Sequence, residues 1–137
     1  DQETIIGVST AIPMQFAMPE CQQPFIEQDL PINEFFYLGE SVLLPQYRGS
    51  GVYRRFFHER EMAAKEFGSK HATFCAVVRE PNDPRRPSGY TPLDSIWHHF
   101  GYEQHPKLSA QYVWQEINEK QQTRKPMAFW IKNLCLP

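Results

Sequence analysis

The sequence has neither a long apolar run nor a cysteine framework. None of its apolar stretches approaches the roughly 20 residues that cross a bilayer, and no signal peptide is visible. Its cysteines are Cys21, Cys75 and Cys135, an odd count without the tight spacing of a disulfide scaffold or a structural zinc site. These features predict a cytoplasmic protein without a membrane partner or a bound metal.

An excess of positive charge is missing as well. The chain has 14 Lys and Arg residues against 16 Asp and Glu residues, for a formal net charge of −2 and a pI of about 6.2. Such a balance provides no global positive field and speaks against a nucleic-acid partner. With 137 residues, of which 41% are apolar, the chain has the size and composition of one globular domain.

The order of apolar segments predicts a mixed α/β fold. Strands are expected at 4–14, 36–44, 71–79, 110–117 and 126–134, and helices at 22–29, 52–67 and 91–101. The central strand, helix and strand form a crossover unit, so the strands at 38–44 and 71–78 are expected to be parallel. The outer strands are expected to be antiparallel, which makes the sheet mixed and mostly antiparallel.

The helix at 52–67 has the clearest periodicity. Val52, Phe56, Ala63 and Phe67 recur at helical spacing and predict the buried face, and Gly68 supplies the C-terminal stop. The mixed segment at 15–36 contains Phe16, Phe25 and Phe35. We expect it either to cover a substrate site or to pack into the core.

Two glycines separate the second strand from this helix, in the stretch PQYRGSGVYRR at 45–55. The first amides of a helix lack intrahelical partners and lie at the positive end of its dipole. Gly49 and Gly51 would let a ligand approach those amides, and Arg48 stands beside them. The stretch predicts either an anion site or a turn in which the glycines serve geometry alone. Neither a Walker nor a Rossmann pattern matches it, since no Gly-Lys-Ser/Thr follows and Arg54 replaces the third Rossmann glycine.

The six residues 46–51, Gln-Tyr-Arg-Gly-Ser-Gly, resemble the Q/R-x-x-G-x-G/A signature of the GNAT superfamily of acetyl-CoA-dependent N-acyltransferases. The flanking elements are similar too, because an apolar strand ends at Pro45, a long helix follows, and a buried strand comes next. The stretch IWHHFGY at 96–102 is similar to the family's late helix. The resemblance implies a single GNAT-like domain at 1–137 that lacks the family's first strand and two helices, which usually wall the acceptor pocket.

The resemblance also implies that acetyl-CoA is the cosubstrate. Its pyrophosphate would lie on the amides of the glycine turn and its pantetheine arm beside the preceding strand, where a backbone amide would polarise the thioester carbonyl. The implied cofactor-binding residues are Val42, Leu43, Leu44, Arg48, Gly49, Ser50, Gly51, Val52, Tyr53 and Asn82.

The implied reaction is direct attack of a primary amine on acetyl-CoA in a ternary complex. An alkyl amine has a pKa of about 10.4, so a base is useful at neutral pH. Glu40, on the strand leading to the cofactor site, is the candidate base; it can equally be a strand-edge carboxylate paired with an arginine. Trp97 stands where the family often has a tyrosine, four residues before Gly101, so a general acid is expected elsewhere, with Tyr90 and Tyr102 as candidates.

The sequence therefore predicts an N-acetyltransferase of unknown amine acceptor. The alternative is a non-catalytic acyl-CoA-binding regulatory module. Aromatic residues in the last two strands, at Tyr112, Trp114, Phe129 and Trp130, are expected to make core or homodimer contacts.

Overall fold

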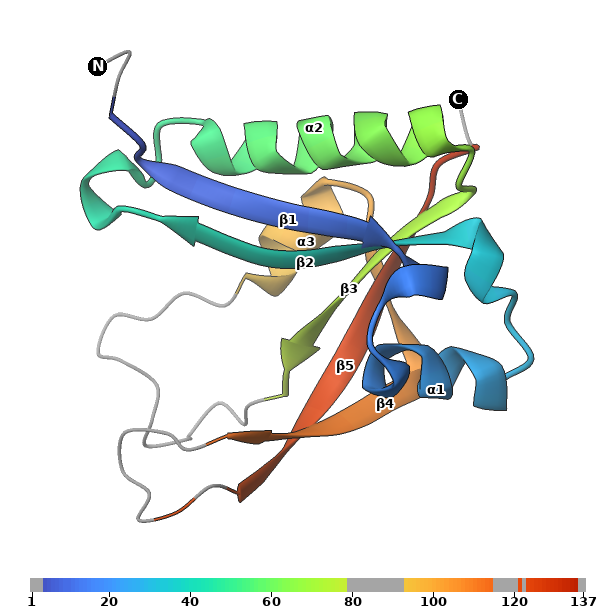
Figure 1. Ribbon diagram of the computed structural model, residues 1–137. Helices are drawn as coiled ribbons and strands as arrows, with labels where there is room; N and C mark the ends of the chain where they lie inside the picture. The colour runs from blue at the N-terminus through green and yellow to red at the C-terminus, as the bar shows by residue number, and fades with distance from the viewer. Residues whose placement is uncertain (1–3, 79–92, 115–120, 122, 136–137) are drawn as a thin grey trace.

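The computed structural model describes residues 4–78, 93–114, 121 and 123–135 (Figure 1). Five strands and three α-helices follow one another as β1 (Gly7–Pro13), α1 (Pro19–Glu27), β2 (Phe35–Leu43), α2 (Val52–Phe67), β3 (His71–Val77), α3 (Asp94–His99), β4 (Glu103–Trp114) and β5 (Thr123–Asn133). Three short 3-10 turns, η1 (Met14–Phe16), η2 (Ile32–Glu34) and η3 (Pro45–Tyr47), lie between them. None of the helices described has the length and apolar composition to cross a membrane.

The strands form one sheet in the order β1-β2-β3-β5-β4. β2 and β3 run parallel, and the other neighbours run antiparallel. The predicted mixed, mostly antiparallel sheet with a central parallel pair is therefore confirmed.

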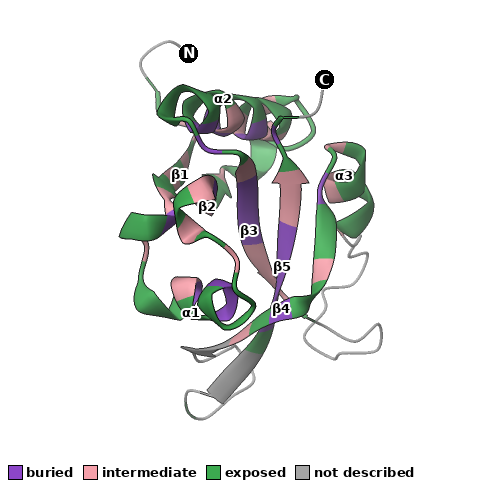
Figure 2. Ribbon diagram, turned by 90° about the vertical axis from the view of Figure 1, so that its right-hand side faces the viewer, coloured by how far each residue is buried: buried purple, intermediate pink, exposed green. Residues whose placement is uncertain are grey.

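Helices cover both faces of the sheet, and a core lies under each. α2 and α3 pack on one face, where the Phe57 ring meets Phe74 edge-on at 5.7 Å between centroids. α1 packs on the opposite face, where Phe25 meets Phe129 edge-on at 5.1 Å. Figure 2 shows buried segments of β3 and β5 between the helices. The central strands are thus apolar on both faces, as expected for strands covered on each side.

The buried face of α2 differs from the prediction. The helix has the predicted bounds, but it buries Phe57, Arg60 and Ala64 and leaves Ala63 and Phe67 exposed. The buried set also has helical spacing, but a charged residue stands in its middle and hides the pattern. Arg60 fits in the core because its guanidinium lies over the Phe57 ring, 5.0 Å from the centroid.

β4 begins well before the strand predicted at 110–117. It runs from Glu103 to Trp114, and the last three residues of the predicted strand lie outside the described residues. The early part contains Pro106 and polar residues, and the pairing with β5 is irregular around it. Proline is tolerated there because β4 is an edge strand, so composition alone concealed the first half of the strand.

Candidate active site

β2 and β3 separate soon after they begin. Their parallel pairing is limited to Phe35–Tyr37 against His71–Thr73, whereas β3 stays paired with β5 as far as Val77. Figure 1 shows the two strands diverging from their common end. Beyond Tyr37, the edge of β2 that faces β3 is no longer paired with that strand.

A β-bulge lies at the start of this gap. Thr10 of β1 faces two residues of β2, Gly39 and Glu40. The Thr10 hydroxyl accepts a hydrogen bond from the Glu40 amide at 3.0 Å, and the Thr10 carbonyl accepts one from Arg60 Nη1 at 3.3 Å. A Cβ at Gly39 would lie 2.5 Å from Thr10 Oγ1, so this position of the bulge requires glycine.

The bulge changes which face of the sheet each residue of β2 meets. Before it, Phe36 and Leu38 point into the core under α2. After it, Ser41 and Leu43 line the surface on that same side, and the exposed Val42 lies between them in sequence. Because one extra residue inverts the alternation of side chains, small and apolar groups face the gap on the α2 side.

A groove of about 690 Å³ lies on this side, between the diverging strands, α2 and α3. Its described lining residues are Gly39, Ser41, Leu43, Arg48, Gly49, Gly51, Tyr53, Arg54, Phe56, Phe57, Arg60, Phe74, Cys75, Leu93, Ile96, Trp97 and Phe100. The floor is largely aromatic and apolar, and the basic residues come from the glycine turn and α2.

The glycine turn presents open backbone at one end of the groove. Gly49 and Gly51 have φ values of +81° and +88°, which favour glycine, and no atom lies within 4 Å of a Cβ built on either residue. Gly51 caps the 16-residue helix α2 without a side-chain hydrogen bond. The helix start therefore has unsatisfied amides, and Arg48 and Arg54 stand beside them. This arrangement fits a phosphate or pyrophosphate group.

The structure brings five of the predicted cofactor-binding residues to this groove: Leu43, Arg48, Gly49, Gly51 and Tyr53. The side chains of the other described ones, Val42, Leu44, Ser50 and Val52, are not among the lining groups. The Ser50 hydroxyl instead donates to the Tyr47 carbonyl and braces the turn. Asn82 lies outside the described residues.

Tyr53 and Trp97 meet across the groove. The Trp97 Nε1–H group donates a hydrogen bond to Tyr53 Oη at 3.2 Å, and the Tyr53 ring packs edge-on against Phe57 at 5.3 Å. Because its oxygen already accepts from the indole, the Tyr53 hydroxyl keeps its own proton for another acceptor. A tyrosine hydroxyl is therefore present in the groove although Trp97 occupies the position where the family often has tyrosine.

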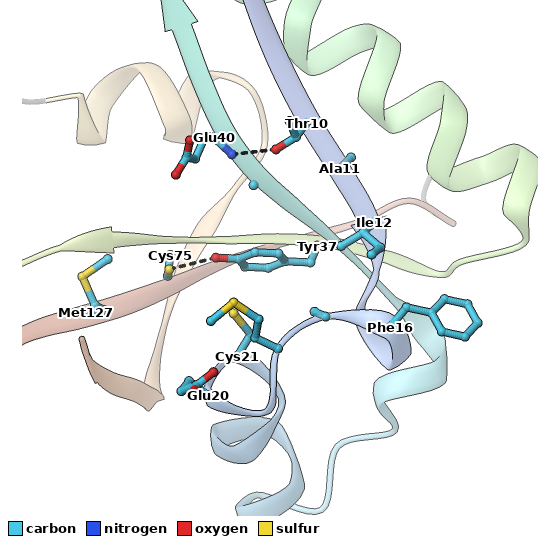
Figure 3. A pocket seen from close by; sticks show the side chains of 13 residues that line it. Thr10, Ala11, Ile12, Phe16, Glu20, Cys21, Tyr37, Glu40, Cys75 and Met127 are labelled. Carbon is cyan, nitrogen blue, oxygen red and sulfur yellow. Dashed lines mark hydrogen bonds between the residues drawn. The ribbon is translucent and has the colours of Figure 1, made fainter. Parts of the chain in front are cut away.

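A second cavity, of about 1010 Å³, lies on the opposite face of the sheet, beside α1 (Figure 3). Its described lining residues are Thr10, Ala11, Ile12, Phe16, Ala17, Met18, Glu20, Cys21, Tyr37, Gly39, Glu40, Cys75 and Met127. Gly39 and Cys75 line this cavity and the groove alike. Both residues lie where β2 and β3 part, a place that we call the junction.

Polar groups of the second cavity lie near the junction. Glu40 lines the second cavity but not the groove. Tyr37 Oη and Cys75 Sγ are 3.3 Å apart, within hydrogen-bond distance, as Figure 3 shows. Of the predicted catalytic residues, Glu40 is an exposed residue of the second cavity, next in sequence to Gly39, and Tyr90 lies outside the described residues. Within the described residues, His, Cys, Asp and Glu do not gather into a group that could hold a metal.

No protein-family model matches the sequence, and no curated protein gives a significant match. Solved structures do match in fold. A GNAT-family acetyltransferase from Elizabethkingia anophelis with acetyl-CoA bound has a TM-score of 0.59 and 10% identity, over 97% of this chain and 71% of that chain. The protein yncA of Salmonella typhimurium, assigned as an acetyltransferase and holding acetyl-CoA, has a TM-score of 0.59 and 10% identity, over 100% and 62% of the two chains.

A protein of Desulfovibrio desulfuricans assigned to the GNAT family of acetyltransferases has a TM-score of 0.60 and 10% identity, over 98% of this chain and 66% of that chain. The chain thus spans about two thirds of the length of these proteins. At such low identity the likeness concerns the fold, and it confirms the fold that the resemblance at residues 46–51 implied. This chain has the fold of the GNAT acetyltransferases.

Proposed function

We propose that the protein transfers an acetyl group from acetyl-CoA to a primary amine by direct attack in a ternary complex. The observation that carries this proposal is that two cavities on opposite faces of the sheet share Gly39 and Cys75 in their linings. Two substrates that enter from opposite faces can place their reacting atoms together there. Holding reactants in this way lowers the barrier without a covalent enzyme intermediate.

The groove on the α2 face would hold acetyl-CoA. Its pyrophosphate would bind the amides at the start of α2, with Arg48 and Arg54 offsetting its charge. Its pantetheine arm would follow the edge of β2 that has left β3, where backbone groups are open to hydrogen bonds. Bound in this way, acetyl-CoA would supply the thioester that the amine attacks.

Glu40 is the proposed base, because its side chain lines only the acceptor side of the junction. It would take a proton from the ammonium group, directly or through water, so that the neutral nitrogen can attack the thioester carbon. The carbon–nitrogen bond forms as the carbon–sulfur bond breaks. Nitrogen loses a second proton as the amide forms, and the departing thiolate takes up one proton, so this step has no net gain or loss of protons. Tyr53 is the proposed proton donor to sulfur.

The rival function, a non-catalytic acyl-CoA-binding module, would need the groove alone. The second cavity and its carboxylate at the junction support the enzyme instead. The homodimer, the cytoplasmic location, the missing N-terminal elements, and the roles of Tyr90 and Asn82 stay predictions.

Two glycine variants test the cofactor assignment. Gly49→Val places a β-branched residue at φ +81° in the turn, whereas Gly68→Val places one at φ +96° at the far end of α2. Each substitution imposes a strain of about 1–2 kcal/mol, so the two variants should lose a similar free energy of unfolding. We expect Gly49→Val alone to abolish acetyl-CoA binding in calorimetry. Equal affinity in the two variants would remove the pyrophosphate assignment, and acetyl-CoA binding by wild type without acetylation of any amine would favour the module.

A further inference from the structure

The second cavity contains charge of one sign only. Among its described lining residues, Glu20 and Glu40 bear carboxylates and none bears a basic group. In Figure 3 their side chains lie on either side of Tyr37 and Cys75, one from α1 and the other from β2. Such a cavity attracts an ammonium group and repels an acceptor that has a carboxylate of its own.

Most of the remaining lining is apolar. Ile12, Ala17, Met18 and Met127 present hydrocarbon or thioether surface, and Met18 is 64% exposed. Apolar side chains that are open to water beside a cavity favour a ligand that covers them. The volume of about 1010 Å³ exceeds what a short alkyl amine would fill and accommodates a drug-sized molecule.

We infer that the acceptor is a primary amine with an apolar body and without a carboxylate, such as an arylalkylamine or a longer alkylamine. The inference rests on the proposed acetyl transfer and assigns the substrate class of the same site. The ammonium group lies toward Glu40 at the junction, and the apolar body extends over Ile12 and Met18. Glu20 is exposed at the start of α1 and acts through its field as a specificity residue.

Matched acceptors test the two halves of this inference. From propylamine to hexylamine, kcat/KM should rise about fourfold for each methylene that becomes buried. The kcat/KM for 2-phenylethylamine should be at least about tenfold that for phenylalanine, which differs by one carboxylate. A kcat/KM that does not change along the alkyl series, or a preference for phenylalanine, would overturn the assignment.

Variants then locate the effect in the cavity. Ile12→Ser should reduce the gain in kcat/KM for each methylene. Val8→Ser should leave that gain unchanged, because Val8 is an exposed residue on the same face of β1 that lies outside the cavity. Glu20→Gln should reduce the ratio of kcat/KM for 2-phenylethylamine to kcat/KM for phenylalanine. Equal effects of Ile12→Ser and Val8→Ser, or an unchanged ratio in Glu20→Gln, would contradict the placement.

These outcomes separate the inference from the function on which it rests. If aminosugars or polyamines are acetylated and apolar amines are not, the substrate class is wrong and the acetyltransferase stands. If acetyl-CoA does not bind, or binds without acetylation of any amine, the proposed function itself fails. Calorimetric titration of hexylamine into the protein with CoA present measures acceptor binding without turnover; no binding of hexylamine would also overturn the inference.

Discussion

Gly39 is one of the residues that line both proposed substrate sites. It lines the groove and the second cavity, and it forms the bulge opposite Thr10. A Cβ at this position would lie 2.5 Å from Thr10 Oγ1, almost 1 Å closer than the 3.4 Å at which ordinary contact begins. Gly39→Ala must therefore move Thr10, the bulge, or both.

Two effects of different size follow from that displacement. Overpacking of this kind lowers the free energy of unfolding by about 1–3 kcal/mol. A shift of about 1 Å at a reacting group can reduce turnover about 100-fold, and the methyl group is added to a residue that lines both cavities. The loss of activity should therefore exceed what the fraction of unfolded protein explains.

The double variant Thr10→Ala/Gly39→Ala separates strain from obstruction. Without the hydroxyl, the closest atoms of residue 10 lie 3.7 Å from the new Cβ, which is ordinary contact. The free energy of unfolding should return to within about 1 kcal/mol of the wild-type value. The remaining loss arises because the Glu40 amide no longer has the Thr10 hydroxyl as its acceptor. Turnover should stay low because the added methyl group remains on a residue that lines both cavities. Thr10→Ala alone is the control.

Urea unfolding gives the stabilities, calorimetry gives the affinity for acetyl-CoA, and mass spectrometry of the acetylated amine gives turnover. Mass spectrometry is preferable to a thiol reagent because Cys135 is exposed and would react. Full turnover by a stably folded Gly39→Ala protein would refute the reasoning, because Gly39 would then not lie where the substrates react.

Three further changes test the chemistry and the pH response. Glu40→Gln should depress turnover more at low pH than at high pH, where the amine has already lost its proton; an unaltered pH profile of kcat would exclude Glu40 as the base. Tyr53→Phe should lower kcat and leave acetyl-CoA affinity unchanged; full kcat would exclude it as the donor to sulfur. Burial, opposed by the Glu34 carboxylate, lowers the pKa of His71 below its ordinary value of about 6.5. The unfolded chain therefore binds more protons as pH falls through that value, so urea unfolding should show stability decreasing with acidification, and His71→Phe should reduce the decrease.

Much of the fold could be predicted from the sequence because its signals are local. The continuous apolar strands and the long periodic helix define the crossover unit, and their order requires parallel strands. The glycine turn could also be recognised locally, since positive φ at Gly49 and Gly51 requires no distant partner.

The junction could not be predicted because it depends on strand pairing. Nothing near Gly39 in the sequence indicates that Thr10, 29 residues earlier, faces both it and Glu40. Arg60 was missed for a related reason, since a charged residue in a helix is expected in water until its partners are known. Glu20 likewise comes to the cavity only through the packing of α1.

The most direct test uses a bisubstrate analogue in which CoA sulfur is joined through a –CH2–CO– linker to the nitrogen of 2-phenylethylamine. If the groove and the second cavity meet at Gly39 and Cys75, one molecule can fill both, and its dissociation constant should fall well below that of CoA. The gain should disappear in Gly39→Ala. An analogue that binds wild-type protein no more tightly than CoA would contradict the account, because the two substrates could then not meet through the sheet.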